Sequence, residues 1–287
     1  MKKSLLFLSI LMFCFQPALA IDQGTAMGTL MVNDEKIVLA YSYAHFHDNA
    51  EGLLDKPKEL RIVLSDREIP QESLRGIIFL PVEDLAKEGK VQGLLMQFDP
   101  DDKTKILVTL LRPPSRAGSS LMTLTLVDST KNLFKRMDIS KRRVTGDIDH
   151  VDTRKAGSDD LPQLSFSAKF DAPLFHELPV TADLKGKAAQ GSPLVKVLRE
   201  KIDALKKGDF DAVKRISTER ANRTTTKFLA QMGDQAKVFA KEAAGDLEQS
   251  LKTMQRIVVR GDDAVMIFSK KGWATFRKEG GQWKSDD

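Results

Sequence analysis

Two histidines in one apolar stretch have the clearest potential for chemistry. His45 and His47 lie two positions apart in a run that alternates like a β-strand, so both side chains project from the same face. Two such imidazoles can share one metal ion, but a zinc site needs three or four ligands. The other two histidines, His150 and His176, lie far along the chain. We therefore predict no metal site and a strand that ends in solvent, unless His150 or His176 converges on the pair.

A catalytic signature is absent from the sequence. The chain contains no Gly-x-Ser-x-Gly motif, no His-Glu-x-x-His motif and no glycine-rich phosphate loop. Its single cysteine, Cys14, lies in a segment that we expect to be removed. The paired carboxylates Asp159-Asp160 and Asp262-Asp263 fall in loop or turn contexts, where solvation explains them. We therefore predict a protein that is not an enzyme, with no catalytic, cofactor-binding or metal-binding residues and no cofactor.

Residues 1–20 have the three parts of a secretory signal peptide. Met1-Lys2-Lys3 supplies positive charge, an apolar block follows over Leu5–Phe15, and Ala18-Leu19-Ala20 forms a small-x-small cleavage site. The apolar block is shorter than the roughly 20 residues that a membrane-spanning helix needs. We expect cleavage after Ala20, no transmembrane anchor, and a periplasmic or secreted protein. The remaining chain would contain no cysteine and hence no disulfide.

The composition after this cleavage limits the classes of partner. The chain would keep 267 residues, enough for two domains that bury their own cores. Its formal net charge would fall from +5 to +3, because Lys2 and Lys3 leave with the leader. An exported protein with so small an excess, spread over a surface of mixed charge, has little reason to meet nucleic acid. We predict no nucleic-acid binding.

Residues 21–181 read as short alternating runs separated by turns. A hairpin is predicted by Thr29–Val32 and Lys36–Phe46 around Asn33-Asp34-Glu35, and the clearest strand, Leu164–Asp171, is expected to close at Ala172-Pro173. Only Pro81–Gly89 has the signals of a well-marked helix. We predict a mostly-β antiparallel sandwich or barrel. The period of two places these side chains on one face of the second strand: Ile37, Leu39, Tyr41, Tyr43, His45 and His47.

This first part also resembles uncharacterised exported bacterial proteins. The resemblance is carried by the segments Tyr41-Ser42-Tyr43-Ala44, Val63–Asp66, Pro81–Gly93 and Lys169–Pro173. It implies no function.

The composition becomes polar at residues 182–191, which we predict to be a linker. Ser192 is suited to cap a helix that starts at Pro193 and stops at Gly208. The apolar side chains of that helix fall within an arc of about 100°: Leu194, Val195, Leu198, Ile202 and Leu205. Further helices are expected, punctuated by Gly233 and Gly245, and then a meander of short strands from about Met254 onward. Residues 192–287 therefore predict an α+β domain.

This second part resembles the nuclear-transport-factor-two-like superfamily, the cone fold shared with ketosteroid isomerase and many bacterial domains of unknown function. The residues that carry the resemblance are Ala204-Leu205-Lys206-Lys207-Gly208-Asp209-Phe210-Asp211-Ala212, Gly261-Asp262-Asp263-Ala264-Val265, Trp273 and Gly280-Gly281-Gln282-Trp283-Lys284. It implies a curved sheet wrapped on a long helix, with a cavity that in some relatives binds or converts small apolar molecules. Ketosteroid-isomerase chemistry needs an oxyanion donor and a carboxylate base. From Ser192 onward the chain has no tyrosine or histidine to replace that donor.

Two functions remain open from the sequence. We favour an exported, non-catalytic binding or adaptor protein with an unknown protein or envelope partner; the alternative is a periplasmic carrier of a small apolar ligand or a metal ion. Both Trp273 and Trp283 are expected in the core or a cavity wall. An enclosed apolar cavity lined by Trp273 and the Leu194/Leu198 face would favour the carrier. A filled cone with an exposed apolar patch would favour the adaptor.

Overall fold

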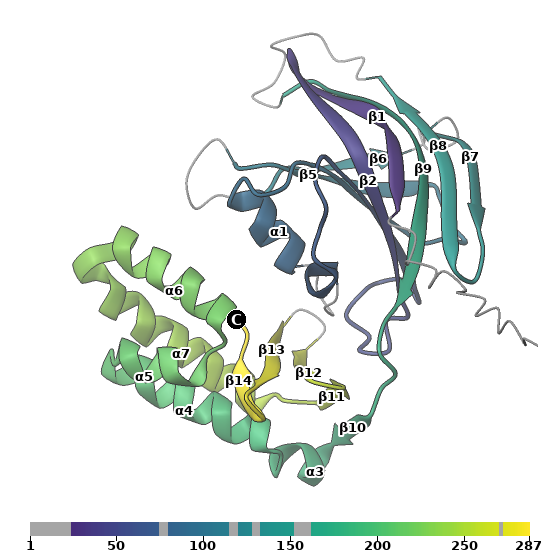
Figure 1. Ribbon diagram of the computed structural model, residues 1–287. Coiled ribbons are helices and arrows are strands. Elements are labelled where there is room, and N and C mark those ends of the chain that lie inside the picture. Colours follow the sequence, from purple (N-terminus) through teal and green to yellow (C-terminus); the bar gives the residue numbers. More distant parts are fainter. Residues whose placement is uncertain (1–23, 75–79, 115–119, 128–132, 152–161, 270–271) are drawn as a thin grey trace, which may run out of the picture.

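The computed structural model describes residues 24–74, 80–114, 120–127, 133–151, 162–269 and 272–287. The chain is mostly β and forms one large curled antiparallel sheet and a second, smaller sheet (Figure 1). The predicted signal peptide and the loop with Asp159-Asp160 lie outside the described residues. Within the part of the chain that is described, none of the helices combines the length and apolar character that crossing a lipid bilayer requires.

The first sheet has nine strands in the order β6-β5-β4-β3-β2-β1-β9-β8-β7. They are β1 (Thr25–Val32), β2 (Glu35–His47), β3 (Glu59–Ser65), β4 (Gly93–Phe98), β5 (Lys105–Leu111), β6 (Thr123–Val127), β7 (Phe134–Ile139), β8 (Arg143–His150) and β9 (Leu164–His176). The predicted hairpin is confirmed, with Val32 opposite Glu35. The antiparallel β-rich prediction is confirmed too, and the strands join in a single half-barrel sheet.

The inner face of the curl holds the larger hydrophobic core. The rings of Phe98 on β4 and Phe134 on β7 lie 5.4 Å apart, centroid to centroid. Their strands are not neighbours in the sheet, so the sheet must curl far enough for its inner face to pack on itself. Leu30, Ile62 and Phe166 are among the side chains that this core buries.

The outer face of the same sheet is covered by a second, smaller cluster. The 3-10 helix η1 (Gln71–Leu74) and helix α1 (Leu80–Lys87) contribute Leu74, Val82 and Ala86, which pack on Val63 and Leu95. Tyr43 belongs to this cluster, and its hydroxyl accepts a 3.0 Å hydrogen bond from the Ile69 amide. The sheet is thus buried on both faces near α1.

The prediction that six side chains of β2 share one face is wrong. Ile37 and Leu39 enter the inner core, whereas Tyr43 packs in the outer cluster. The register between β1 and β2 shifts between Thr25 and Gly28, which marks a β-bulge. A bulge interrupts the strict alternation of a strand, and the sequence period alone does not reveal it.

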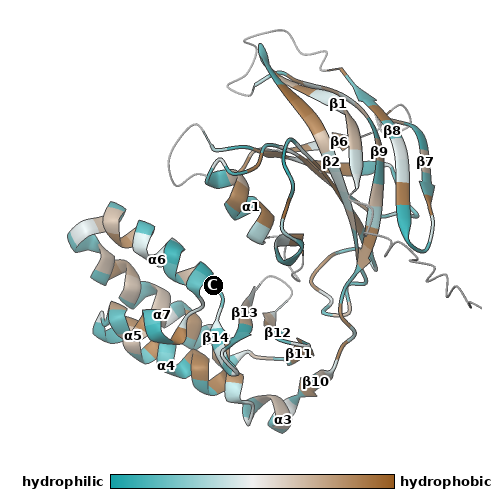
Figure 2. Cartoon of the chain, viewed as in Figure 1, coloured by the Kyte–Doolittle hydropathy of each residue, from teal (hydrophilic) through white to brown (hydrophobic). Residues whose placement is uncertain are grey.

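The second sheet follows the order β10-β11-β12-β13-β14 and is accompanied by helices. Its strands are β10 (Ala182–Lys185), β11 (Arg256–Arg260), β12 (Asp263–Ser269), β13 (Gly272–Glu279) and β14 (Gln282–Ser285). The helices are α3 (Gly186–Gln190), α4 (Pro193–Lys207), α5 (Phe210–Ile216), α6 (Glu219–Met232), the 3-10 helix η2 (Gly233–Gln235) and α7 (Ala236–Lys252). α4 and α7 alternate hydrophobic and hydrophilic residues, as helices with one buried face do (Figure 2).

The ends of α4 are as predicted. The Ser192 hydroxyl accepts from the Leu194 amide, Pro193 opens the helix, and Gly208 ends it in the left-handed region at φ 66°. Leu194 and Leu198 pack against the second sheet, in the same core as Ile257 and Phe276. The helix therefore buries the face that its sequence period predicts.

Three boundaries differ from the predictions. The proposed linker 182–191 carries β10, which pairs with β11, and α3, so its backbone bonds are used within the second sheet. β9 continues through Pro173 to His176, because Leu174 donates toward β8 and the proline nitrogen faces the side where β1 has ended. Helix α7 passes through Gly245, since packing of its buried face outweighs the roughly 1 kcal/mol that an interior glycine costs.

Candidate functional site

A polar cluster lies just beyond the first residue of β1, where β2 and β9 become neighbours. β1 lies between β2 and β9 and begins at Thr25, opposite Asp171. Beyond that point β2 and β9 run on and pair with each other in parallel, with Phe46 opposite His176. The next residue of each strand is therefore His47 and Glu177, whose side chains meet: the Nδ1 atom of His47 contacts Oε1 of Glu177.

The second sheet completes this cluster, which we call the junction cluster (His47, Asp48, Glu51, Glu177 and Arg260). Arg260 is the last residue of β11, and its Nε donates to Glu51 Oε1 at 2.5 Å. Its Nη1 donates to the Leu178 carbonyl at 2.6 Å, and its Nη2 pairs with Asp48. Arg260 thus ties the second sheet to two strand ends of the first.

Burial makes these charges strongly dependent on one another. His47, Glu51 and Arg260 are each exposed by 3% or less. Burial disfavours the charged form of Arg260, but its bonds to Glu51 and Asp48 raise the pKa of the guanidinium. Burial also opposes ionisation of Asp48, yet the hydrogen bonds from Arg260 and the Ala50 amide hold the pKa of Asp48 below its ordinary value. Water therefore screens the charges of Glu51 and Arg260 weakly, whereas Asp48 is half exposed.

The histidines do not converge as a four-histidine site. His45 is buried beside Arg61; burial first, and then the Arg61 charge, lowers its pKa to about 3. His176 packs its ring on Phe46, with centroids 5.8 Å apart. His150 lies farther away against Phe166, so neither distant histidine joins His47 as a ligand. The predicted exit of the strand into solvent is seen at Asp48, which is exposed, but His45 and His47 are both buried.

Sequence reasoning missed Glu51, Glu177 and Arg260. Glu51 follows His47 by four positions, and Glu177 and Arg260 stand at or directly after the last residue of a strand. Charged residues near the ends of strands predict a common site only when the pairing of those strands is known. Here that pairing joins residues 130 and more positions apart.

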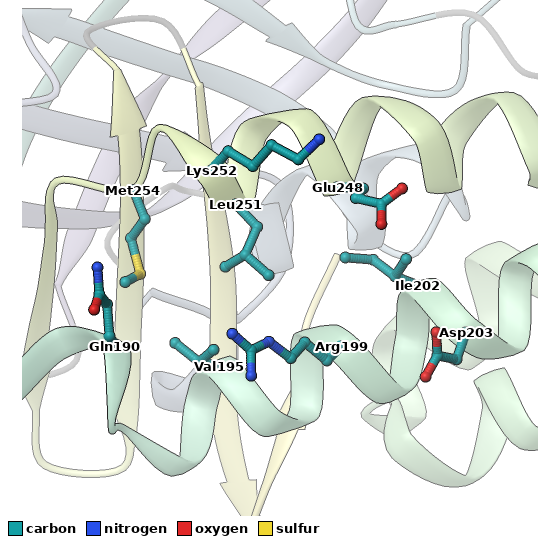
Figure 3. Close-up of a pocket in the computed structure, with 9 residues that line it drawn as sticks. All are labelled: Gln190, Val195, Arg199, Ile202, Asp203, Glu248, Leu251, Lys252 and Met254. Carbon is teal, nitrogen blue, oxygen red and sulfur yellow. The ribbon is translucent and has the colours of Figure 1, made fainter. Parts of the chain in front are cut away.

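A second candidate is an open groove between α4 and α7, with a volume of about 560 Å³ (Figure 3). Its floor is apolar and consists of Val195, Ile202, Leu251 and Met254. Its rim is polar and consists of Gln190, Arg199, Asp203, Glu248 and Lys252. Glu248 already receives a 2.8 Å bond from Lys206, which holds the pKa of Glu248 below its ordinary value. Arg199, Asp203 and Lys252 frame the apolar floor.

The site that a small-ligand carrier would need is occupied by the protein's own side chains. The Leu194/Leu198 face packs in the core against the sheet and does not line the groove. Trp283 packs partly against this core, but Trp273 is 41% exposed, so the prediction of a buried Trp273 is wrong. Trp273 is the second residue of β13, which begins at Gly272.

Large apolar side chains are exposed on the α6–α7 pair. Ala221 is the one buried residue of α6, and Phe228 on the same helix meets Phe239 on α7 edge to face, with centroids 6.3 Å apart. Both rings and the neighbouring Val238 remain substantially exposed. These features match an exposed apolar patch next to a filled core.

Another buried charged group, which we call the tail cluster, surrounds the last residues described. Lys201 on α4 donates from Nζ to Ser285 Oγ at 2.7 Å. Asp287 accepts from the Thr275 amide at 3.0 Å, and Arg220 on α6 lies 3.1 Å from an Asp286 carboxylate oxygen. Arg220 also reaches Asp84 on α1 at 3.4 Å, which links α6 to the first sheet's outer helix.

Comparisons with protein-family models, with curated proteins and with solved structures give no match to this chain.

Proposed function

We propose that this protein is a non-catalytic adaptor that binds an amphipathic peptide segment of a partner protein in the α4–α7 groove. The groove carries the proposal, because it pairs an apolar floor with charged side chains on both walls (Figure 3). Pockets of roughly 300–1,000 Å³ with apolar walls and a few polar groups are typical binding sites. An amphipathic helix is recognised by such a surface through a short row of apolar anchors.

The occupied sheet-facing core supports an adaptor over a carrier. Leu194 and Leu198 are buried against the second sheet, together with Ile257 and Phe276. The groove is open to solvent along one side, so it suits a segment that lies across it more than a ligand that must be enclosed. The rim charges Arg199, Asp203 and Lys252 would set the orientation of a segment with charges of both signs.

The wider assignment goes with this proposal. We propose that residues 192–287 belong to the nuclear-transport-factor-two-like superfamily, on the order of helices followed by a meander. We propose further that residues 1–20 direct export and that the protein acts in the periplasm or outside the cell. The unknown partner would then be a protein of that compartment or of the cell envelope.

Selection from a display library of random peptides tests the adaptor directly. We expect the wild type to enrich amphipathic peptides that the double variant Arg199→Glu, Lys252→Glu binds at least about ten-fold more weakly, since each lost charged hydrogen bond costs roughly 1.5–3 kcal/mol. Lys196→Glu is the matched control, because Lys196 lies on the same helix with its side chain 80% exposed and outside the groove.

Two results would contradict the adaptor. One is enrichment of peptides that bind the groove variant and the wild type equally well. The other is a lipid-sized mass that native mass spectrometry finds bound to gently purified protein, which supports the carrier. A bare polypeptide mass together with groove-dependent peptides supports the adaptor.

A further inference from the structure

We propose that His47, Glu51 and Glu177 bind one divalent transition-metal ion of the class of Zn²⁺ or Mn²⁺. This site lies at the junction of the two sheets, outside the α4–α7 groove, and goes beyond the proposed adaptor function. One nitrogen of His47 and one carboxylate oxygen each of Glu51 and Glu177 lie within 4.8 Å of one another. Zinc bonds to nitrogen and oxygen are about 2.0–2.2 Å long, so small side-chain movements bring all three atoms to one ion.

The donor set selects the kind of ion. An imidazole nitrogen suits zinc and other transition metals, whereas Mg²⁺ and Ca²⁺ prefer sites built from oxygen alone. Two carboxylates beside one imidazole keep manganese in the same range of candidates. Three protein ligands leave room for a water molecule, which is the usual composition of an open zinc site.

The charges of the junction cluster favour a divalent ion. Asp48, Glu51 and Glu177 are three carboxylates, and Arg260 is the one guanidinium that faces all three. The two buried carboxylates, Glu51 and Glu177, exceed the guanidinium of Arg260 by one charge, and the third carboxylate, Asp48, is half exposed. Uncompensated charge is costly away from water, and a divalent cation cancels it.

Glu177 supplies an independent sign of a missing ligand. Its side chain is 94% buried, at 6% exposure, and Oε1 contacts His47. Its second oxygen, Oε2, has no hydrogen-bond partner among the described residues and is held only by a 3.5 Å ion pair with Nη2 of Arg260. A buried carboxylate oxygen without a donor is an exception that calls for an ion or a water molecule.

Arg260 contacts both glutamates and so orients them. Its Nε donates to Glu51 Oε1, and the other oxygen, Oε2, lies 3.9 Å from His47 Nε2 and accepts only a long, 3.5 Å hydrogen bond from Arg260 Nη2. Groups that hold ligating carboxylates from behind are a regular part of metal sites. Asp48, whose side chain is half exposed, marks the side from which an ion can enter.

Equilibrium dialysis of the full chain with Zn²⁺ and Mn²⁺, followed by elemental analysis, tests the site. We expect one ion per chain, unaffected by an excess of Mg²⁺ or Ca²⁺. Glu177→Gln and His47→Gln should each lower the affinity by about 100-fold or more, since even outer partners of a metal typically contribute 10–100-fold. His176→Gln is the matched control: His176 directly precedes Glu177, lies opposite Phe46 in the pairing of β2 with β9, and is exposed, so the variant should bind as the wild type does.

Substitution with Co²⁺ gives a readout that does not depend on the variants folding. Wild-type protein should show the visible absorption bands of cobalt bound to nitrogen and oxygen ligands, and Zn²⁺ should displace them. The proposal is overturned if the wild type binds no ion above a control protein, or if His47→Gln and Glu177→Gln bind as tightly as the wild type. Because the groove is not involved, the peptide selection can fail or succeed independently of this result.

Discussion

The junction cluster and the tail cluster are both buried and charged, but they differ in balance. In the tail cluster, two cations, Lys201 and Arg220, face three carboxylates, Asp84, Asp286 and Asp287. In the junction cluster, three carboxylates face Arg260. The tail cluster also receives hydroxyl donors, from Thr218 and Thr275, whereas Glu177 keeps one oxygen without a hydrogen bond.

This difference separates a structural group from a candidate binding site. A cluster in which each charge and polar atom has a partner within the protein stabilises one arrangement of the chain and does not require a bound ion. A cluster with surplus negative charge and an unsatisfied oxygen gains from a further cation. The balance of buried charge is therefore a better guide to function here than the histidine spacing of β2.

The largest effect is expected for Arg260→Met, measured by urea unfolding in the presence of a chelator. The variant leaves Glu51 and Glu177 buried without their cation, and breaking a buried pair on one side typically costs about 3–5 kcal/mol. Arg256→Met on the same strand is the control. Its pair with Asp183 is partly exposed, and pairs of that kind contribute about 0–1 kcal/mol. An equal loss of unfolding free energy in the two variants would contradict the expectation that the buried ion pairs of Arg260 matter more than the partly exposed pair of Arg256.

A smaller loss, about 1–3 kcal/mol, is expected for Lys201→Met. Methionine fills the volume of the buried lysine stem, and Asp287 keeps the Thr275 amide and hydroxyl as donors. What is lost is the bond to Ser285 and the nearby positive charge. Lys196→Met, exposed on the same helix, should leave the urea midpoint almost unchanged. A loss as large as that of Arg260→Met would mean that the tail cluster is no better compensated than the junction.

The smallest effect is a pH dependence carried by Asp287. Burial raises the pKa of the Asp287 carboxyl, against the opposing influence of Lys201 and Thr275. The folded protein therefore holds this proton to higher pH than the unfolded chain, whose carboxyl titrates near 3.8. This contribution is present below that pH and is lost as the pH rises through the folded pKa.

Asparagine has no titratable carboxyl group, so the Asp287→Asn variant lacks this pH dependence. Its urea midpoint should therefore rise relative to that of the wild type as the pH increases from about 3 to 7. Asp234→Asn, in the exposed η2 turn, should show a difference that does not vary in this way. A constant difference for Asp287→Asn would contradict the raised pKa of the Asp287 carboxyl.

Much of the fold could be predicted from local patterns. The alternation of Leu164–Asp171 and the caps Ser192 and Gly208 act within a few residues, so their signals survive in the sequence. The errors at Pro173 and Gly245 share one cause. Both residues usually end a strand or a helix, but here β9 continues through Pro173 and α7 continues through Gly245, because each packs against neighbouring elements. Local propensity is overridden where tertiary packing supplies the missing stabilisation.

The junction cluster could not be predicted in the same way. His47 attracted attention as a partner of His45, but a bulge and a strand that starts late determine what it actually faces. Its partners come from a turn, from the end of β9 and from the second sheet. Only the registers of several strand pairs together bring Glu177 and Arg260 to it.

The parallel pairing of β2 with β9 also sets an order of events in folding. His47 and Glu177 are 130 positions apart, and Asp48 and Arg260 are 212 apart. Closing such long loops costs chain entropy before any contact repays it, so these contacts form slowly and late. During synthesis β9 emerges after β1 and β2, and Arg260 emerges later still. We expect the contacts of the junction cluster to form last. They would then fix the completed first sheet against the second sheet.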